Sequence, residues 1–420
     1  MGLLDRSGFR LELAAVLARP RRAGTQIAVF TLRLRRVRRI RAALGDAAAD
    51  ALLTEAAHRL AAFIGGASLA RLDGTRFCFY RQVSGEDEAC EFARGVFAAF
   101  QRPLDAHGVD VVIGVNVGIG LAPLGMDGAE EVMSQSGCAL DRAAALSEYS
   151  VNLYTPSLRE SAARRLALEA ALRRALEHDL SLHLQYQPKV GLTAWNLYGV
   201  EALCRWTCPN FGVVPASEFI SIAEESELIE LLGWWVLEQV CQQLLRWRAE
   251  GFVLPCVAIN LSGRQLSDAE LPRKILQCTS RHGLAPALFE FEITESTIVA
   301  DVSVAAATLA RIRALGFRVT LDDFGAEHSN LHYLRKLPID SLKIDKQFVE
   351  DLADGGADEA LCRAMLLLGD MLELPLIVEG VETEWQCATL IRLGFQWGQG
   401  FHFSAALPAA ELADRWLARH

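Results

Sequence analysis

Apolar and polar positions in the first part of the chain repeat with two different periods, and this mixture predicts an α+β domain. Residues 8–18 have the spacing of a short amphipathic helix that packs on its own domain. Asp73-Gly74 is a turn signal between two short strand-like segments, so it predicts a hairpin. The order predicted after residue 25 is a strand, two helices with a turn at Gly45, a hairpin, a helix, a strand and a helix: 26–34, 36–64, 69–80, 87–103, 109–121 and 128–147.

A helical pattern that begins at Pro156 separates this part from the rest of the chain. Proline suits the first turn of a helix, and Ser157 with Glu160 has the pattern of a capping box. Helical spacing continues to about Asp179, and we interpret this helix as a connector between domains. The segments expected are an N-terminal segment, an α+β domain, a linker helix and a second domain: 1–24, 25–157, 158–179 and 172–420.

In the second domain, strand-like and helix-like segments alternate to the end of the chain. Eight such strands, alternating with helices, predict an α/β fold, a (β/α)8 barrel of the TIM type. The predicted strands are 182–187, 198–203, 256–261, 288–293, 317–322, 340–344, 375–379 and 395–401.

Composition and charge exclude some classes of function. Hydrophobic residues make up 51% of the 420 residues, and 52 acidic residues against 42 basic ones give a net charge of −10. Nucleic-acid binding depends on basic surface, so we expect no nucleic-acid partner. The ten cysteines contain no Cys-x-x-Cys pair, no apolar run reaches the ~18 residues of a membrane span, and no signal peptide is evident. We therefore expect a cytoplasmic protein with reduced thiols.

Polar residues stand at the ends of seven of the predicted barrel strands, where barrels of this type place their active sites. In chain order they are Glu201, Asn260, Glu292 with Glu295, Asp322-Asp323, Lys343, Glu379 with Glu382, and Gln399. One such residue is usually a helix cap or a salt bridge, but carboxylates gathered on one rim repel each other unless cations lie between them. Ligand sets made only of oxygen favour Mg²⁺ or Mn²⁺, and two such cations are suited to phosphodiester cleavage.

The second domain resembles the EAL domain family of cyclic di-GMP phosphodiesterases. The naming motif stands as Glu201-Ala202-Leu203, continued by Cys204-Arg205-Trp206. The other motifs follow in family order: Tyr186-Gln187-Pro188, Pro215 to Ile220, Asn260-Leu261-Ser262, Glu292 to Glu295, Asp322 to Gly325, Lys343-Ile344-Asp345, Glu379 to Glu382 and Gly398-Gln399-Gly400. The match extends along the whole predicted barrel, so the resemblance is specific.

The resemblance implies a role for each of these residues. Glu201, Asn260, Glu292 and Asp322 would ligate one metal, and Asp322 with Asp323 would ligate a second. Glu379, Lys343 and Glu295 would serve catalysis, by holding a water, positioning it and anchoring the loop after the fifth strand. Gln187, Arg205, Glu382 and Gln399 would form the substrate pocket. The implied reaction is hydrolysis of cyclic di-GMP to linear pGpG with two Mg²⁺ or Mn²⁺ ions, in a homodimer formed through the barrel.

The loop after Asp322-Asp323 departs from the family pattern. The family has a second glycine and an aromatic residue where this chain has Glu327 and His328. A glutamate at a position that needs positive φ costs about 1 kcal/mol or more, and it adds negative charge near the phosphates. Two functions therefore remain open: a phosphodiesterase, and a receptor that binds cyclic di-GMP without hydrolysis and acts through a protein partner. Ser404 to Pro408 also lacks the usual basic residue.

The first domain resembles a degenerate GGDEF domain, the diguanylate cyclase fold. Its signature turn reads Asp73-Gly74-Thr75-Arg76-Phe77, and Arg33 and Arg35 occupy the two aspartate positions of the first strand. An arginine repels a cation, so we expect no cyclase activity and a regulatory role. Six arginines crowd the region after this strand: Arg33, Arg35, Arg36, Arg38, Arg39 and Arg41. They form either a solvated helix face, with Val37 and Ile40 pointing inward, or a site for an acidic partner or nucleotide phosphates.

Overall fold

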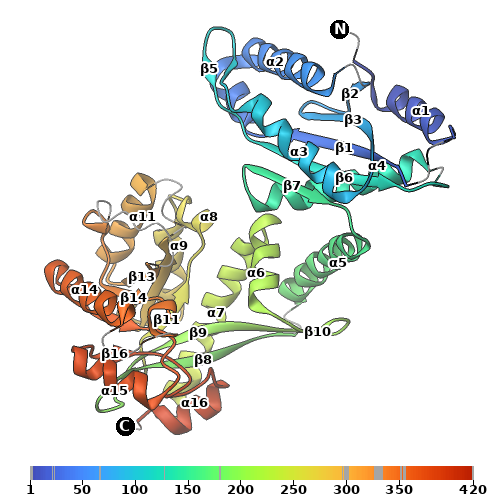
Figure 1. The fold of residues 1–420 in the computed structure, drawn as a ribbon. Coiled ribbons are helices and arrows are strands. Elements are labelled where there is room, and N and C mark those ends of the chain that lie inside the picture. The colour runs from blue at the N-terminus through green and yellow to red at the C-terminus, as the bar shows by residue number, and fades with distance from the viewer. Residues whose placement is uncertain are drawn as a thin grey trace. The chain divides into compact units, whose positions relative to one another are not determined.

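The chain forms two compact units, and each is described by itself. The computed structural model describes residues 3–418, except 21, 23, 66–67, 127, 179–180, 296, 298–301, 326–333, 351 and 353–355. The first unit is Met1–Leu166 and the second is Ala167–His420 (Figure 1).

The first unit is a five-stranded sheet covered by helices. The sheet has the order β2-β3-β1-β6-β7, in which the central strand β1 pairs antiparallel with both β3 and β6. Its elements are α1 (Arg6–Leu17), β1 (Gln26–Leu34), α2 (Val37–Ile64), β2 (Leu69–Arg71), β3 (Arg76–Val83), α3 (Glu86–Phe100), β4 (Leu104–Asp105), β5 (Asp110–Val111), β6 (Val115–Ala122), α4 (Ala129–Leu146), β7 (Tyr149–Leu153) and α5 (Pro156–His178), which continues into the second unit from Ala167 onward.

Several local predictions for this unit are confirmed. The N-terminal helix α1 buries Phe9, Leu13 and Leu17 against its own domain. Gly45 breaks α2 with a backbone φ of 86°, which glycine adopts without a steric penalty. The hairpin β2–β3 turns at Asp73-Gly74, where the Asp73 carboxylate accepts hydrogen bonds from the next backbone amides. The short strands β4 and β7 were not among the predicted elements, and the predicted strand 109–121 is divided into β5 and β6.

The second unit is a closed barrel. Its strands follow the order β9-β11-β12-β13-β14-β15-β16-β8, and β8 pairs back with β9 to close the ring. The strands are β8 (Leu182–Gly191), β9 (Leu197–Cys208), β10 (Gly212–Val214), β11 (Val257–Asn260), β12 (Phe289–Thr294), β13 (Arg318–Phe324), β14 (Ser341–Ile344), β15 (Leu376–Val378) and β16 (Trp397–Gly398), of which β10 only extends β9.

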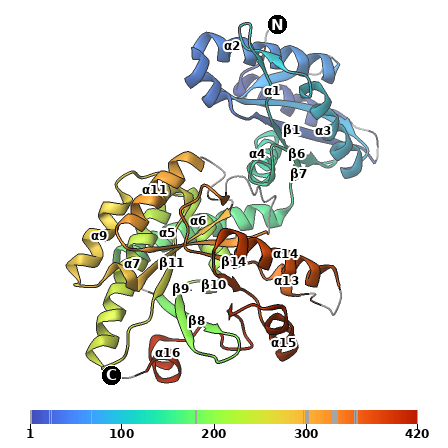
Figure 2. The ribbon, with the colours of Figure 1, turned by 90° about the vertical axis from the view of Figure 1, so that its left-hand side faces the viewer.

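Helices lie around the outside of these strands (Figure 2). They are α6 (Ala216–Glu225), α7 (Leu228–Ala249), α8 (Gly263–Leu266), α9 (Leu271–Arg281), the 3₁₀ turn η1 (Pro286–Leu288), α11 (Val302–Ala314), α13 (Gln347–Glu350), α14 (Ala357–Leu372), α15 (Glu384–Leu393) and α16 (Ala409–Trp416). A large apolar core between helices and strands includes Trp206, Trp247 and Phe291. The predicted α/β barrel is therefore confirmed.

One strand of the barrel is antiparallel to the others, whereas all eight strands of a regular TIM barrel are parallel. β8 is antiparallel to both of its neighbours, β16 and β9. A parallel connection needs a crossover of a dozen or more residues, whereas only residues 192–196 join β8 to β9. The two strands therefore form a hairpin, and the other connections in the ring are parallel.

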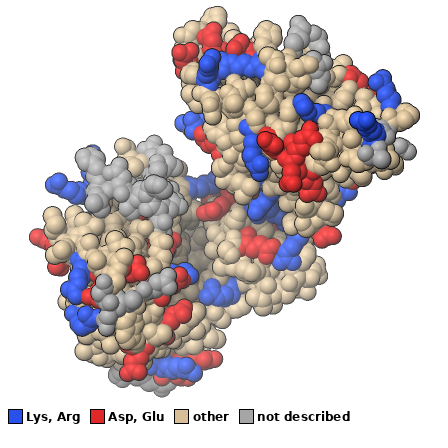
Figure 3. All heavy atoms as spheres, viewed as in Figure 1, with Lys and Arg blue, Asp and Glu red and all other residues tan. Residues whose placement is uncertain are grey.

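Two surface properties complete the description. On the face drawn in Figure 3, basic and acidic side chains are interspersed. Within the residues that the structure describes, no helix combines the length and the apolar character needed to cross a membrane.

All eight tryptophans lie in the second unit, between Trp195 and Trp416, so tryptophan fluorescence reports on the barrel alone.

Candidate functional site

The barrel brings most of the predicted site residues to one end, because its parallel strands all finish there. Alternation along each strand points every second side chain inward, so Glu292 and its neighbour Glu290 are both buried inside the barrel. The structure places Glu201 in β9, Asn260 at the end of β11, Glu292 in β12, Asp322 and Asp323 in β13, Lys343 in β14, Glu379 directly after β15 and Gln399 directly after β16.

Five of the predicted carboxylates form two overlapping groups. Oxygen atoms of Glu201, Glu292 and Asp322 all lie within 4.8 Å of one another, and so do oxygen atoms of Asp322, Asp323 and Glu379. Asp322 belongs to both groups, as expected for a carboxylate that bridges two cations. Glu201, Glu292 and Asp322 are each less than a tenth exposed.

Asp323 joins this cluster through an unusual backbone conformation. Adjacent residues of a regular strand point to opposite faces, so Asp322 and Asp323 would normally diverge. Here Asp323 has a φ of 52°, and the pairing of β13 with β14 shifts register between Leu321 and Phe324. A non-glycine residue with positive φ in a strand is uncommon, and such backbone is often found at functional sites. The irregularity lets both consecutive carboxylates face the same region.

Lys343 places one buried ammonium group among these carboxylates. Its Nζ lies 3.3 Å from Glu201 Oε2, 3.2 Å from Glu292 Oε2, 3.1 Å from Asp322 Oδ2 and 2.6 Å from Glu379 Oε1. Burial alone would lower the pKa of Lys343, but attraction to the surrounding carboxylates raises it well above its ordinary value. The lysine is therefore a fixed positive charge at the centre of the site.

One lysine cannot compensate all of this negative charge. Burial, together with the charge of Glu201, raises the pKa of Glu292 to about 8. Burial and neighbouring carboxylates likewise raise the pKa values of Asp322 and Glu379 to about 7. Glu201 is the exception: burial opposes its ionisation, but Lys343 and hydrogen bonds from Gln399 and Asn260 hold its pKa down at about 2. Full ionisation of the cluster requires additional positive charge.

We expect the barrel without divalent cations to lose stability as the pH rises from about 5 to about 8. Glu292, Asp322 and Glu379 have higher pKa values when folded than their ordinary values of 4.5, 3.8 and 4.5, so in this range the folded state holds more protons than the unfolded state. Stability then falls with pH. The thermal midpoint in EDTA, followed by tryptophan fluorescence at pH 5 and pH 8, measures this effect. Mn²⁺ should remove most of the decrease, and a midpoint that rises with pH in EDTA would contradict it.

Amide side chains hold the ionised Glu201 in place. Asn260 Nδ2 donates to Glu201 Oε1 at 3.0 Å, and Gln399 Nε2 donates to Glu201 Oε2 at 2.9 Å and to Gln187 Oε1 at 3.1 Å. Among the described residues, Gln399 Oε1 is a buried side-chain oxygen without a hydrogen-bond partner. An acceptor left open beside a carboxylate cluster suits a ligand or a water that donates to it.

The remaining predicted residues lie farther from the cluster or on its edge. Arg205 is on the same face of β9 as Glu201, about 13 Å along the strand, and its Nε donates to Gln185 Oε1 at 3.1 Å. Glu382 is exposed next to the start of α15. Glu295 is buried directly after β12, but the loop that it is predicted to anchor, with Glu327 and His328, lies outside the described residues.

The sequence analysis missed a second layer of charge below the site. Lys189 of β8 is fully buried and forms an ion pair with Glu290, and its Nζ lies 3.1 Å from Glu292 Oε1. Glu292 therefore contacts one lysine through each carboxylate oxygen. The available signals in the sequence were a lysine between Pro188 and Val190, just after the predicted strand 182–187, and two glutamates at alternate positions of the predicted strand 288–293.

The residues present fit divalent cations. The donor set consists of carboxylates and an amide oxygen, and the carboxylates carry more negative charge than the buried lysines offset. Asn260 uses its amide nitrogen on Glu201, which leaves its Oδ1 for a cation. The donor set does not by itself distinguish Mg²⁺ from Mn²⁺.

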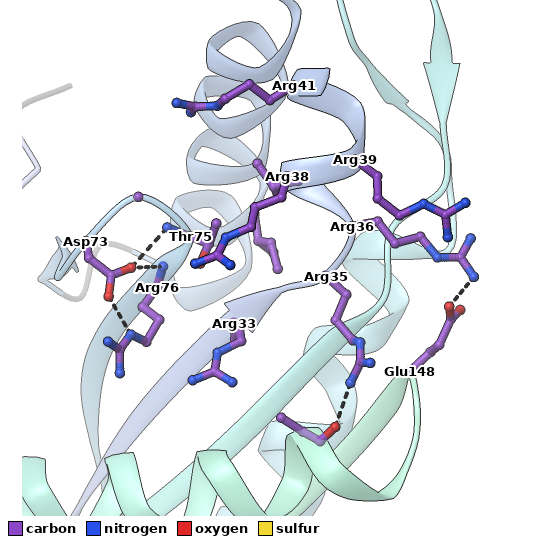
Figure 4. Close-up of a pocket in the computed structure, with 14 residues that line it drawn as sticks. Arg33, Arg35, Arg36, Arg38, Arg39, Arg41, Asp73, Thr75, Arg76 and Glu148 are labelled. Carbon is purple, nitrogen blue, oxygen red and sulfur yellow. Dashed lines mark hydrogen bonds and ion pairs between the residues drawn. The ribbon is translucent and has the colours of Figure 1, made fainter. Parts of the chain in front are cut away.

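The first unit contains a separate cavity of about 1130 Å³ lined by arginines. Figure 4 shows six arginines around it: Arg33 from β1, Arg35 and Arg36 from the link between β1 and α2, and Arg38, Arg39 and Arg41 from the start of α2. Several are paired: Arg33 with Asp141, Arg36 with Glu148, and Arg41 with Asp46 and Asp50. Within the described residues, Arg38 and Arg39 have no ion pair. Val37 and Ile40 are buried, as predicted.

Comparison with known proteins gives matches to both units. The family model described as EAL domain matches residues 169–406, and the one described as diguanylate cyclase, GGDEF domain, matches residues 1–147. The cyclic di-GMP phosphodiesterase NbdA of Pseudomonas aeruginosa is 31% identical over 414 residues, which are 98% of this chain and 53% of NbdA. The cyclic di-GMP phosphodiesterase PA2567 of the same organism is 31% identical over 425 residues, which are 100% of this chain and 71% of that protein.

A solved structure described as PaMucR phosphodiesterase in complex with cyclic di-GMP is 39% identical, with a TM-score of 0.55. The match covers 59% of this chain and 99% of that one. The chain spans about half the length of several of the curated relatives that it matches.

Proposed function

The chain belongs to the EAL domain family, as a tandem GGDEF–EAL protein, and from this premise we propose that its barrel hydrolyses cyclic di-GMP to linear pGpG. The observation that carries the proposal is the buried cluster in which Asp322 belongs to two groups of carboxylates. Such a cluster is costly without cations and is suited to a pair of them. The proteins named as cyclic di-GMP phosphodiesterases among its relatives support the choice of substrate.

We propose that Glu201, Asn260, Glu292 and Asp322 hold one Mg²⁺ or Mn²⁺ ion, and that Asp322 and Asp323 hold a second. Bound there, the two ions would supply the positive charge that favours ionised water and stabilises the attacking and leaving oxygens. Gln399 and Asn260 keep Glu201 ionised and oriented.

In this proposal, Glu379 would accept a proton from the attacking water, and Lys343 would orient Glu379. Lys343 Nζ lies 2.6 Å from Glu379 Oε1, so the lysine donates to the carboxylate and fixes its orientation. Burial raises the pKa of Glu379 to about 7, which is near the pH at which the enzyme would work and therefore suits a general base. Gln187 and Arg205, on the neighbouring strands β8 and β9, would contact the cyclic dinucleotide, with Arg205 on a phosphate.

A direct assay tests the proposal. The purified chain is incubated with cyclic di-GMP and Mg²⁺ or Mn²⁺, and the products are separated by chromatography. We expect linear pGpG to appear in the presence of either cation and to be absent in EDTA. Tight binding of cyclic di-GMP with no product over hours would instead favour the receptor.

The receptor is the second candidate because of the altered loop. Glu327 and His328 replace a glycine and an aromatic residue of the family pattern close in sequence to Asp323. If this change prevents the second cation from binding, the first group of ligands and the substrate residues still support binding without turnover. Measuring how many Mn²⁺ ions bind per chain in the presence of cyclic di-GMP distinguishes two cations from one.

We further propose that the GGDEF domain is degenerate, catalytically silent and regulatory. Arg33 and Arg35 stand at the end of β1, where the family has aspartates, and both line the arginine cavity (Figure 4). Arg33 is paired with Asp141, and Arg35 donates to the carbonyl of Ala144 at 2.6 Å. Cationic side chains held at these positions repel the divalent cations that bring nucleotide phosphates to a cyclase.

We expect the purified chain to make no cyclic di-GMP from GTP and Mg²⁺. The physical reason is the positive charge at the two aspartate positions, which leaves no carboxylate pair for a cation there. Chromatography after overnight incubation measures this, with an active diguanylate cyclase assayed in parallel. Formation of cyclic di-GMP would overturn the prediction.

The arginine cavity supports a second candidate function for this domain, binding of an acidic protein partner or of nucleotide phosphates without a metal. Arg38 and Arg39, which have no ion pair among the described residues, are the side chains most available for it. Calorimetric titration with GTP in EDTA measures whether the domain binds a nucleotide without a metal. The wild type is compared with the double variant Arg38→Gln/Arg39→Gln. If the double variant bound GTP with the same affinity as wild type, or if neither bound GTP, Arg38 and Arg39 would be a solvent-exposed face of α2 and not part of a nucleotide site.

We propose a homodimer formed through the barrel, in keeping with the family resemblance. On α14, Leu361, Leu367 and Met371 are 44%, 65% and 83% exposed, so this helix offers an apolar surface to a second copy. Light scattering coupled to gel filtration measures the mass of the assembly.

A further inference from the structure

Two helices on the outside of the barrel hold a cluster of metal-binding side chains that the phosphodiesterase site does not use. α7 and α9 pack against each other (Figure 2). Cys241 is buried on α7, while Cys278 and His282 stand four residues apart at the end of α9 and so share one face of the helix. The two sulfur atoms and a ring nitrogen of His282 all lie within 4.8 Å of one another.

A carboxylate from α7 borders the same cluster. Glu238 lies one helical turn before Cys241, and its Oε1 is 2.9 Å from His282 Nε2 while its Oε2 is 3.6 Å from Cys278 Sγ. Arg281 donates to Glu238 Oε2 at 2.6 Å. A carboxylate beside a histidine is a common companion of zinc sites, because it orients the imidazole or enters the coordination sphere.

We propose that Cys241, Cys278 and His282 bind a zinc ion, with Glu238 or a water as the fourth ligand. Two thiolates and an imidazole favour a borderline-soft cation such as Zn²⁺, whereas the oxygen ligands of the barrel rim favour Mg²⁺ or Mn²⁺. A tetrahedral zinc ion with bonds of about 2.3 Å to sulfur needs sulfur atoms about 3.8 Å apart. The observed separations reach this geometry with small side-chain movements.

The local charges permit such an ion at a buried position. Binding releases the thiol protons of Cys241 and Cys278, so two thiolates balance the two positive charges of Zn²⁺, and the imidazole is neutral. The charge of Glu238 is already balanced by Arg281.

The ion would join two helices that lie beside the strands of the catalytic rim. α7 leads into β11, which ends in Asn260, and α9 precedes β12, which carries Glu292. Zinc at this place would therefore stabilise the part of the barrel that presents two ligands of the first metal, without taking part in the chemistry. In the absence of zinc, the same residues form a buried thiol, Cys241, and a half-buried thiol, Cys278, beside a His282–Glu238 contact.

Cobalt(II) as a probe separates the two sites of the full chain. The reduced protein, stripped of metal with a chelator, is titrated with Co²⁺, and the near-ultraviolet thiolate-to-cobalt absorption is recorded. The carboxylates and amides of the rim contribute no such band. We expect a band that saturates at one equivalent and disappears when one equivalent of Zn²⁺ is added.

Variants make the assignment specific. Cys278 is half-buried, so Cys278→Ser should fold, and it should lose the band. His282→Gln should keep a shifted, weaker band, because two thiolates remain. Cys256→Ser, a half-buried cysteine elsewhere in the barrel, is the matched control and should behave as wild type. Zn²⁺ should raise the thermal midpoint of wild type and of Cys256→Ser by more than that of Cys278→Ser, in which only the carboxylates of the rim remain to bind the ion. Absence of the band in wild type, or its persistence in Cys278→Ser, would overturn the proposal whatever the phosphodiesterase activity.

Discussion

Glu201→Gln is expected to lower the rate of cyclic di-GMP hydrolysis about 10³-fold while leaving binding of the dinucleotide nearly intact. The substitution keeps the shape of the side chain but removes a charge that three groups, Lys343, Asn260 and Gln399, hold ionised. A catalytic metal contributes several kcal/mol to the transition state, and each 1.4 kcal/mol is a factor of ten in rate. Chromatographic assay of pGpG gives the rate, and calorimetry in Ca²⁺ or EDTA gives the affinity.

The matched control for this change is Glu411→Gln, which removes the same charge from the exposed surface of α16. It should hydrolyse cyclic di-GMP at the rate of wild type. If Glu201→Gln retained a rate within threefold of wild type, Glu201 would not be a ligand of an essential metal. If it lost binding as well as rate, the variant could not distinguish a phosphodiesterase from a receptor, and Glu379→Gln would replace it.

Lys343→Met should destabilise the cation-free barrel by about 3–5 kcal/mol, because it leaves several buried carboxylates without their compensating charge. The lysine is 1% exposed, and its ammonium contacts Glu201, Glu292, Asp322 and Glu379. Divalent cations supply charge at the same place, so the deficit should shrink in Mn²⁺. Denaturation at pH 8 followed by tryptophan fluorescence measures the unfolding of the barrel without a contribution from the first unit.

Lys346→Met is the matched control, three residues further along the chain. Its side chain is 66% exposed, and among the described residues its ion pair is with Glu350 on the surface, so its loss should change stability by about 0.5 kcal/mol or less. A deficit of Lys343→Met below about 1 kcal/mol in EDTA, or an equal deficit with and without Mn²⁺, would mean that the lysine does not balance the charge of the metal ligands.

The sequence was informative wherever a periodic pattern was followed by a polar residue. Glu201, Asn260, Glu292 and Asp322 were identified because each ends a predicted strand, and parallel strands finish at one rim of a barrel. Two features were not predictable in this way. The direction of β8 follows from a connection too short for a crossover, and the inward position of Asp323 follows from a positive φ that no propensity assigns to an aspartate.

The Cys241–Cys278–His282 cluster escaped sequence analysis for a related reason. Its members are separated by up to 41 residues, and neither cysteine belongs to a Cys-x-x-Cys pair. Only the packing of α7 on α9 brings them together. Short motifs reveal sites whose ligands are close in sequence, whereas sites formed between helices depend on tertiary structure.

Glu292 contacts Lys189 with one carboxylate oxygen and Lys343 with the other, and these contacts limit which substitutions the barrel interior can tolerate. Glu290, Lys189, Glu292 and Lys343 form a continuous column of alternating charge through the interior. A neutral residue at any one of these four positions leaves the charge of the neighbouring side chain without an opposite charge. The effects of substitutions in the column are therefore strongly non-additive, and a substitution at one position is tolerated only with a compensating substitution at the adjacent position. The interior of the barrel is therefore expected to evolve as a linked set, even at positions too deep to touch a substrate.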